Sequence, residues 1–223
     1  MHDDLTMNTV DRDGALAETA GRLGETRAGF LAKSAVAGGG LVGGGAVLGL
    51  LAPAALAQEQ EGEAPASDTD IANFALTLEE LEAAFYAEAI ARGSLTGEAL
   101  QFAQVAGAHE AEHVTALRGV LGAAAIPAPT FAFGAATGDP GLFLATAIEL
   151  EATGVQAYKG QAPLIRSRAL LAAALSIHSV EAKHTAWVRL IAGRVPIPVP
   201  LDKPLTRENV LSKLGRTGFI VAA

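Results

Sequence analysis

Glutamate, tyrosine and histidine residues recur in the same order in the two halves of this chain. The eight residues are Glu79, Tyr86, Glu110 and His113, and then Glu151, Tyr158, Glu181 and His184. The Glu and Tyr positions repeat after 72 residues and the Glu-x-x-His steps after 71, and the chain has no other tyrosine. If four helices each contribute one element, four carboxylates and two imidazoles meet at one level. That is a ligand set for two metal ions.

The types of these ligands limit the metal that they can bind. Hard carboxylates with imidazole favour iron or manganese, and we favour iron. The chain has no cysteine, which excludes thiolate zinc sites, iron–sulfur clusters and a cysteine nucleophile. Four carboxylates balance two divalent ions, and such a pair supplies two-electron chemistry with oxygen or peroxide without an organic cofactor. The expected metal ligands are Glu79, Glu110, His113, Glu151, Glu181 and His184.

The elements that must position these ligands are helices. Alanine, leucine and valine dominate the composition and aromatic residues make up only 5%, which favours packed helices over sheets. Gly93 and Gly122 end two helical patterns, Asp139-Pro140 begins another, and Gly160 with Pro163 breaks it. We expect helices at about 68–92, 96–121, 139–159 and 167–192, and a short helix near 206–214.

The ligand positions predict how these helices pair. Residues equidistant from the turn of an antiparallel hairpin meet at one level. The midpoint of Glu79 and Glu110 falls at about residue 94, and that of Glu151 and Glu181 at about residue 166, each in or beside a predicted turn. The sequence therefore predicts an all-α, four-helix bundle over 68–193, made of two antiparallel hairpins. A long crossover at 122–139 joins them, and a C-terminal extension follows at 194–223.

Glu82 lies on the edge of the apolar helix face that contains Glu79 and competes with it as a ligand. Its counterpart in the second half is Gly154, so the duplication favours Glu79. We therefore expect Glu82 behind the ligands or at the rim of the site.

Two further histidines and two further glutamates lie near the repeated residues. His109 and His178 fall at the flanks of their apolar faces and are expected to be boundary histidines rather than ligands. Glu80 and Glu112 point away from those faces and are expected in solvent.

The first 57 residues differ from the rest of the chain. No charge interrupts the sequence from Ser34 to Gln58, and seven glycines make the run a poor helix in water. It ends in Ala55-Leu56-Ala57, an A-x-A pattern typical of the cleavage site of a secretory signal. Arg27, Phe30 and Leu31 resemble a degenerate twin-arginine export signal. We expect residues 1–57 to be an export signal or an uncleaved membrane anchor, and 58–67 a disordered linker.

The repeated residues resemble those of the ferritin-like superfamily, in particular the exported bacterial branch related to desiccation-associated proteins. The known di-iron pattern of such bundles is a Glu from each of two helices and Glu-x-x-His from each of the other two. The resemblance covers about 68–193. It implies two iron or manganese ions bridged by carboxylates. It also implies that Tyr86 and Tyr158 form hydrogen bonds to the ligating residues without contacting the metal themselves.

Two classes of function remain open at this level. One is an exported redox metalloprotein, a ferroxidase or peroxide-consuming enzyme, that acts on oxygen, peroxide or ferrous iron. The other is a stress-related structural or binding bundle in which any metal only holds the helices together. The net charge of −8 argues against a nucleic-acid partner, and contact with a membrane is expected only through an uncleaved N-terminal segment.

Overall fold

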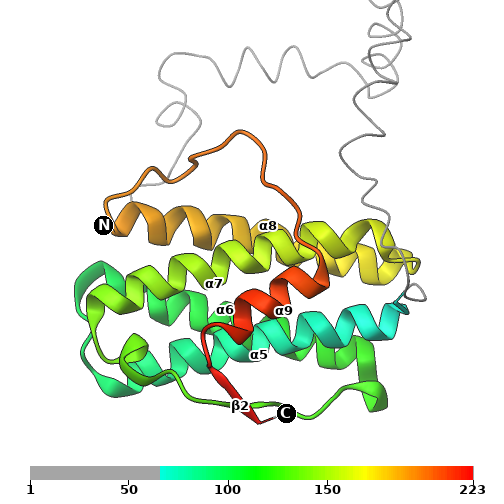
Figure 1. Ribbon diagram of the computed structural model, residues 1–223, viewed down its shortest axis with the longest axis horizontal. Coiled ribbons are helices and arrows are strands. Elements are labelled where there is room, and N and C mark those ends of the chain that lie inside the picture. The colour runs from blue at the N-terminus through cyan, green and yellow to red at the C-terminus, as the bar shows by residue number, and fades with distance from the viewer. Residues whose placement is uncertain (1–65, 223) are drawn as a thin grey trace, which may run out of the picture. The chain divides into compact units, whose positions relative to one another are not determined.

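The structure is a computed structural model that describes residues 66–222 (Figure 1). The expected export signal or anchor and most of the linker lie outside the described residues. The helices are α5 (Asp68–Arg92), α6 (Gly97–Leu121), α7 (Pro140–Gln161), α8 (Arg168–Ile191) and α9 (Arg207–Gly215). The all-α fold class is therefore confirmed. Within the described residues, no helix combines the length and apolar character needed to cross a membrane.

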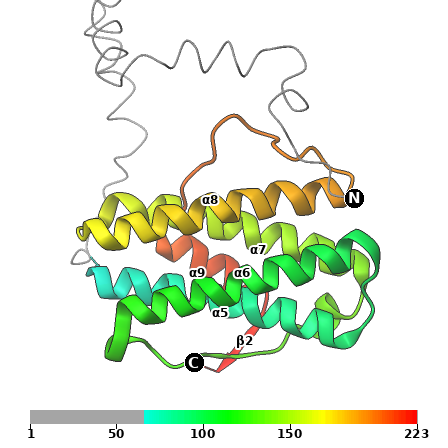
Figure 2. The ribbon, with the colours of Figure 1, turned by 180° about the vertical axis from the view of Figure 1, so that it is seen from behind.

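Four of these helices form the bundle. Helix α5 packs chiefly on α6, and α7 packs chiefly on α8, so each pair is a hairpin. The pairs also contact each other through α5 with α7 and α6 with α8. Figure 2, seen from behind, shows α8 and α6 on the face opposite to α9. The arrangement is the ferritin-like bundle of two hairpins that the sequence predicts.

Side chains at the helix ends explain where the helices begin. Ser67 and Asp70 form a capping box at the start of α5, and the Asp139 side chain accepts a hydrogen bond from the Leu142 amide at the start of α7. Asp68 accepts hydrogen bonds from the amides of Arg166 and Ser167 at 2.9 and 2.6 Å. This contact ties the first helix to the turn before α8.

The crossover between the hairpins contains short elements that the sequence did not indicate. These are η1 (Gly122–Ala124), β1 (Thr130–Phe131) and η2 (Gly134–Thr137), and β1 pairs antiparallel with β2 (Ile220–Ala222) near the C-terminus. Phe133 packs edge-on against Phe219 with ring centroids 5.2 Å apart. The C-terminal extension thus returns to cover the crossover.

The core consists of two clusters of buried apolar residues. One contains Phe85, Tyr86, Phe102 and Phe143 and extends to Val210 and Leu214 of α9. The other contains Leu76, Leu117, Tyr158 and Ile177. Each cluster includes one of the two tyrosines of the sequence repeat, Tyr86 in the first and Tyr158 in the second.

Gly160 does not end α7, contrary to the prediction that the helix stops at about Lys159. The helix continues to Gln161, and η3 (Ala162–Leu164) follows. A Cβ at Gly160 would lie 1.9 Å from the backbone oxygen of Leu205, in the segment that leads into α9. The Leu205 amide also donates to the Gln156 carbonyl at 3.1 Å. The glycine is therefore required by the close approach of the C-terminal extension.

Replacing Gly160 with alanine should destabilise the protein by roughly 1–3 kcal/mol, because the Leu205 backbone must move. Gly119 is the matched control, since it lies in α6 with nothing within 4 Å of an added Cβ. Gly119→Ala should stabilise the helix by up to about 1 kcal/mol. Urea unfolding of both variants measures the difference, and equal stabilisation by the two alanines would contradict this role of Gly160.

Candidate metal centre

All six expected ligands lie in the interior of the bundle, one element from each helix. Glu79 comes from α5, Glu151 from α7, and the two Glu-x-x-His steps from α6 and α8. The four glutamates are 0% exposed, and His113 and His184 are 8% and 3% exposed. A buried carboxylate needs hydrogen bonds or a cation to offset the loss of water. Four of them at one level therefore call for a positively charged occupant.

The ligand atoms converge in two overlapping groups. One group is formed by Glu79, Glu110, His113 and Glu181, and the other by Glu110, Glu151, Glu181 and His184. Within each group one ligand atom per residue lies within 4.8 Å of all the others. Glu110 and Glu181 belong to both groups. Each group could hold one metal ion, and the two groups share two carboxylates.

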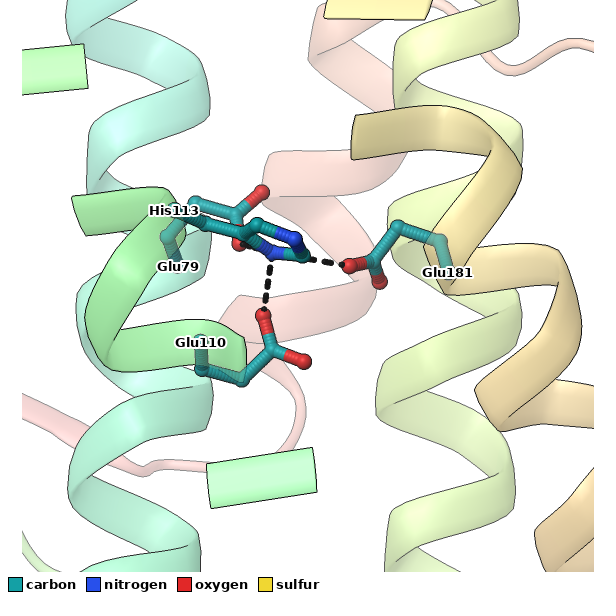
Figure 3. A group of neighbouring side chains, drawn as sticks. All are labelled: Glu79, Glu110, His113 and Glu181. Carbon is teal, nitrogen blue, oxygen red and sulfur yellow. Dashed lines mark hydrogen bonds and ion pairs between the residues drawn. The ribbon is translucent and has the colours of Figure 1, made fainter. Parts of the chain in front are cut away.

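His113 lies at the centre of the first group (Figure 3). Its Nδ1 is 3.0 Å from Glu79 Oε2, 2.9 Å from Glu110 Oε2 and 3.3 Å from Glu181 Oε1. One imidazole nitrogen therefore faces oxygens from three different helices. A metal ion with these four residues as ligands would replace the proton on that nitrogen.

His184 repeats this geometry in the second group. Its Nδ1 lies 3.0 Å from Glu110 Oε1 and 3.3 Å from Glu151 Oε2. Its other nitrogen, Nε2, is 2.8 Å from Nδ1 of His109, and the two rings stack with centroids 5.1 Å apart. His109 thus contacts the outer side of His184 and belongs to neither ligand group.

Several polar atoms of this cluster have no hydrogen-bond partner among the described residues. Oε2 of Glu181 and both oxygens of Glu82 lack a hydrogen-bond or ion-pair partner in the described part of the chain. Oε1 of Glu110, Oε2 of Glu151, Oε1 of Glu181 and Nδ1 of His184 take part only in the ion pairs given above. Buried polar atoms without partners are rare in proteins. The six residues therefore fit a pair of cations with a preference for oxygen and imidazole, such as iron or manganese.

The electrostatics without metal reflect this crowding of charge. Burial raises the pKa of Glu79 to about 8, and burial together with the charge of Glu79 raises that of Glu181 well above its usual value. Burial would also raise the pKa of Glu110, but contacts with His113 and His184 outweigh it and lower the pKa to about 2. Burial opposes charge on the imidazoles, yet their carboxylate partners raise the pKa of His113 to about 12 and of His184 to about 9. In the absence of metal, bound protons hold the cluster together.

The two tyrosines contact carboxylates of the opposite half of the repeat. The Tyr158 hydroxyl donates to Glu79 Oε1 at 2.5 Å, and the Tyr86 hydroxyl donates to Glu151 Oε1. Burial and the adjacent carboxylate raise the pKa of each phenol well above its usual value, so both remain donors. Each tyrosine thereby fixes the orientation of one glutamate that belongs to a single ligand group.

The other glutamates and histidines considered as candidates belong to neither ligand group. Glu82 is buried beside the cluster, as discussed below. Glu112 is exposed as predicted, whereas the prediction for Glu80 was wrong: it is 8% exposed and forms an ion pair with Arg118 of α6. The partner lies 38 residues away, which helix periodicity alone does not reveal. His178 is half-buried and outside both ligand groups.

Comparison with known proteins agrees with the geometry. The sequence pattern of the family described as "Ferritin-like domain" matches residues 67–194, which span all four bundle helices and every residue of the two ligand groups. No curated protein matches the chain. The match covers more than half of the sequence, and the chain therefore belongs to the ferritin-like domain family.

Proposed function

We propose that this protein binds two iron or manganese ions, with iron favoured, and uses them for redox chemistry on oxygen, peroxide or ferrous iron. One observation carries the proposal: two groups of buried ligand atoms share Glu110 and Glu181, and many of these atoms have no hydrogen-bond partner among the described residues. Two cations would satisfy these carboxylate oxygens together, which hydrogen bonds among the described residues do only in part.

The residues divide into bridging and terminal ligands. Glu110 and Glu181 would bridge the ions, because they belong to both groups. Glu79 with His113 would complete one site, and Glu151 with His184 the other. Four carboxylates and two neutral imidazoles balance two divalent ions. If Nδ1 of His184 held a metal ion, the neutral imidazole would carry its proton on Nε2 and would donate it to Nδ1 of His109.

When bound, the ion pair supplies two-electron redox chemistry with oxygen or peroxide. The protein contributes fixed ligands and a dry interior. A small apolar crevice with room for about 10 Å³ is lined by Phe74, Leu78, Leu117 and Tyr158 among others. Since Tyr158 also contacts Glu79, this crevice lies beside one of the two ligand groups.

Activity assays test the redox proposal against a purely structural role. The protein loaded with ferrous iron should take up oxygen and form ferric iron, or the metal-loaded protein should consume peroxide. Glu112→Gln is the control, because Glu112 is exposed on the same helix as Glu110. A protein that binds both ions but leaves oxygen, peroxide and ferrous iron unchanged would instead be a metal-stabilised structural bundle.

The tyrosines provide a graded test of the ligand assignment. Tyr158→Phe should weaken binding of the ion held by Glu79, and Tyr86→Phe that of the ion held by Glu151. Loss of a hydrogen bond behind a ligand typically costs about 10- to 100-fold in metal affinity. Competition with a chelator measures both affinities. Unchanged affinities in both variants would mean that the hydroxyls do not orient the ligands.

We also propose that residues 1–57 direct export of the protein, with a twin-arginine-like signal, to the periplasm or the cell exterior. The support is the uncharged, glycine-rich run and the Ala55-Leu56-Ala57 step. N-terminal sequencing of the native protein should find a mature chain that starts near Gln58. An intact leader in the membrane fraction would favour an anchor.

A further inference from the structure

Glu82 is a buried carboxylate that the two ligand groups do not use. It lies on α5 one turn after Glu79, is 2% exposed, and neither of its oxygens has a hydrogen-bond partner among the described residues. Leu78, Leu81, Leu150 and Leu214 surround one side of it. Whether protonated or ionised, a carboxyl group in such surroundings lacks the partners that buried polar groups normally have.

The charged groups closest in effect to Glu82 are all carboxylates. Burial raises the pKa of Glu82 well above its usual value, and the charges of Glu181, Glu151, Glu110 and Glu79 raise it further, in that order. These are the four glutamates of the proposed metal site. A fifth carboxylate beside them increases the repulsion in the cluster, which bound protons relieve in the metal-free protein and metal ions would relieve in the metal-bound protein.

The second half of the repeat makes space at the position equivalent to Glu82. That position is Gly154, and a Cβ there would lie 2.7 Å from Glu181 Oε2 and 3.7 Å from Glu82 Oε2. The carboxylates of Glu82 and Glu181 therefore border the same small space, which any side chain at 154 would fill. One half of the repeat supplies a carboxylate and the other half supplies room for it.

The position of Glu82 along α5 indicates which metal site it serves. The helix runs from Glu79, in the first ligand group, to Tyr86, whose hydroxyl contacts Glu151 of the second group. Glu82 lies between them on the same helix. It is thus displaced from Glu79 in the direction of the Glu151 site.

We propose that Glu82 is a seventh protein ligand of the metal centre, which binds the ion held by Glu151, Glu181 and His184 through the space beside Gly154. The inference rests on the proposed dinuclear site and goes beyond its repeated ligand set. The proposal makes the two sites unequal: the first has Glu79 as its single unshared carboxylate, and the second has Glu151 and Glu82. The internal symmetry of the fold is broken at the pair Glu82 and Gly154.

Cobalt(II) binding to the full chain tests this assignment without reference to activity. Glu82→Gln should still bind two ions, but one of them at least tenfold more weakly than in the unaltered protein. Its cobalt absorption bands should also intensify, since these bands grow stronger as the number of ligands falls. Glu80→Gln is the matched control, because it removes a charge from the same helix at a residue paired with Arg118. It should bind both ions normally.

A second variant separates ligand loss from misfolding. Glu82→Leu should raise the melting temperature of the metal-free protein, because it replaces an unpartnered carboxyl among leucines, and should show the same weakened binding. Two ions bound by Glu82→Gln with unaltered affinity and an unaltered spectrum would overturn the role of Glu82 alone. Unaltered protein that binds no cobalt would overturn the dinuclear site together with this assignment.

Discussion

Replacing Glu110 and Glu181 together with alanine should abolish binding of both metal ions. Each of these residues belongs to both ligand groups, so their removal takes two carboxylates from each group and leaves one glutamate and one histidine of that group, with Glu82 in addition at the second site. Loss of direct ligands should exceed the roughly 10- to 100-fold that follows from loss of an outer hydrogen bond. Titration with ferrous or manganous ions, followed by calorimetry, measures the loss.

Two further variants give this prediction its contrast. Glu151→Ala removes a residue of one group only and should weaken the binding of one ion much more than that of the other. Glu112→Ala removes an exposed glutamate between Glu110 and His113 and should bind both ions normally. If the double variant retained both ions, Glu110 and Glu181 would not be shared ligands. If Glu151→Ala lost both ions equally, Glu151 would not belong to one site alone.

The metal-free protein should lose stability as the pH rises from about 5 to 9. Glu79, with a pKa raised to about 8, stays protonated in the folded state over a range where the unfolded chain has released that proton. His184, with a pKa raised to about 9, behaves in the same way above pH 6.5. The folded state thus binds more protons, so the free energy of unfolding falls by about 1.4 kcal/mol per pH unit for each excess proton.

Glu110 makes the metal-free protein less stable at low pH. Its pKa is lowered to about 2, so its contribution is complete above the unfolded value of about 4.5 and disappears as the pH falls toward 2. Metal-free protein should therefore be most stable near pH 5. Bound metal reverses the alkaline trend, because it requires deprotonated ligands and its affinity rises with pH.

Urea unfolding at pH 5.5, 7 and 8.5, with a chelator and with manganese, measures this dependence. The stability difference between the two forms should widen as the pH rises. A metal-free protein of equal stability at all three pH values would show that the buried cluster does not hold extra protons.

The helices and their pairing follow from the sequence because their signals are local. The capping residues Ser67 and Asp139 and the turn glycine Gly93 lie within a few residues of the ends they determine. The internal repeat then supplies what local signals cannot, since two equal spacings predict which helix positions meet. This is why the sequence alone predicted that the six residues of the two ligand groups lie at one level of the bundle.

The features that the sequence did not reveal depend on contacts between distant segments. Gly160 looks like a helix stop until Leu205 lies against it, and Glu80 looks exposed until Arg118 of the next helix reaches it. The contact of His109 with His184 was missed for the same reason, although one local signal existed. His109 precedes His113 by four residues and therefore lies on the same side of α6.

The most direct test of the account is the metal content of the protein purified in its native folded state. Elemental analysis should find about two iron or manganese ions per chain, and the Glu110→Ala and Glu181→Ala double variant should carry none. A folded native protein that contains no metal and binds none on addition of ferrous or manganous ions would contradict the dinuclear site, and would leave a bundle whose buried carboxylates are held by protons alone.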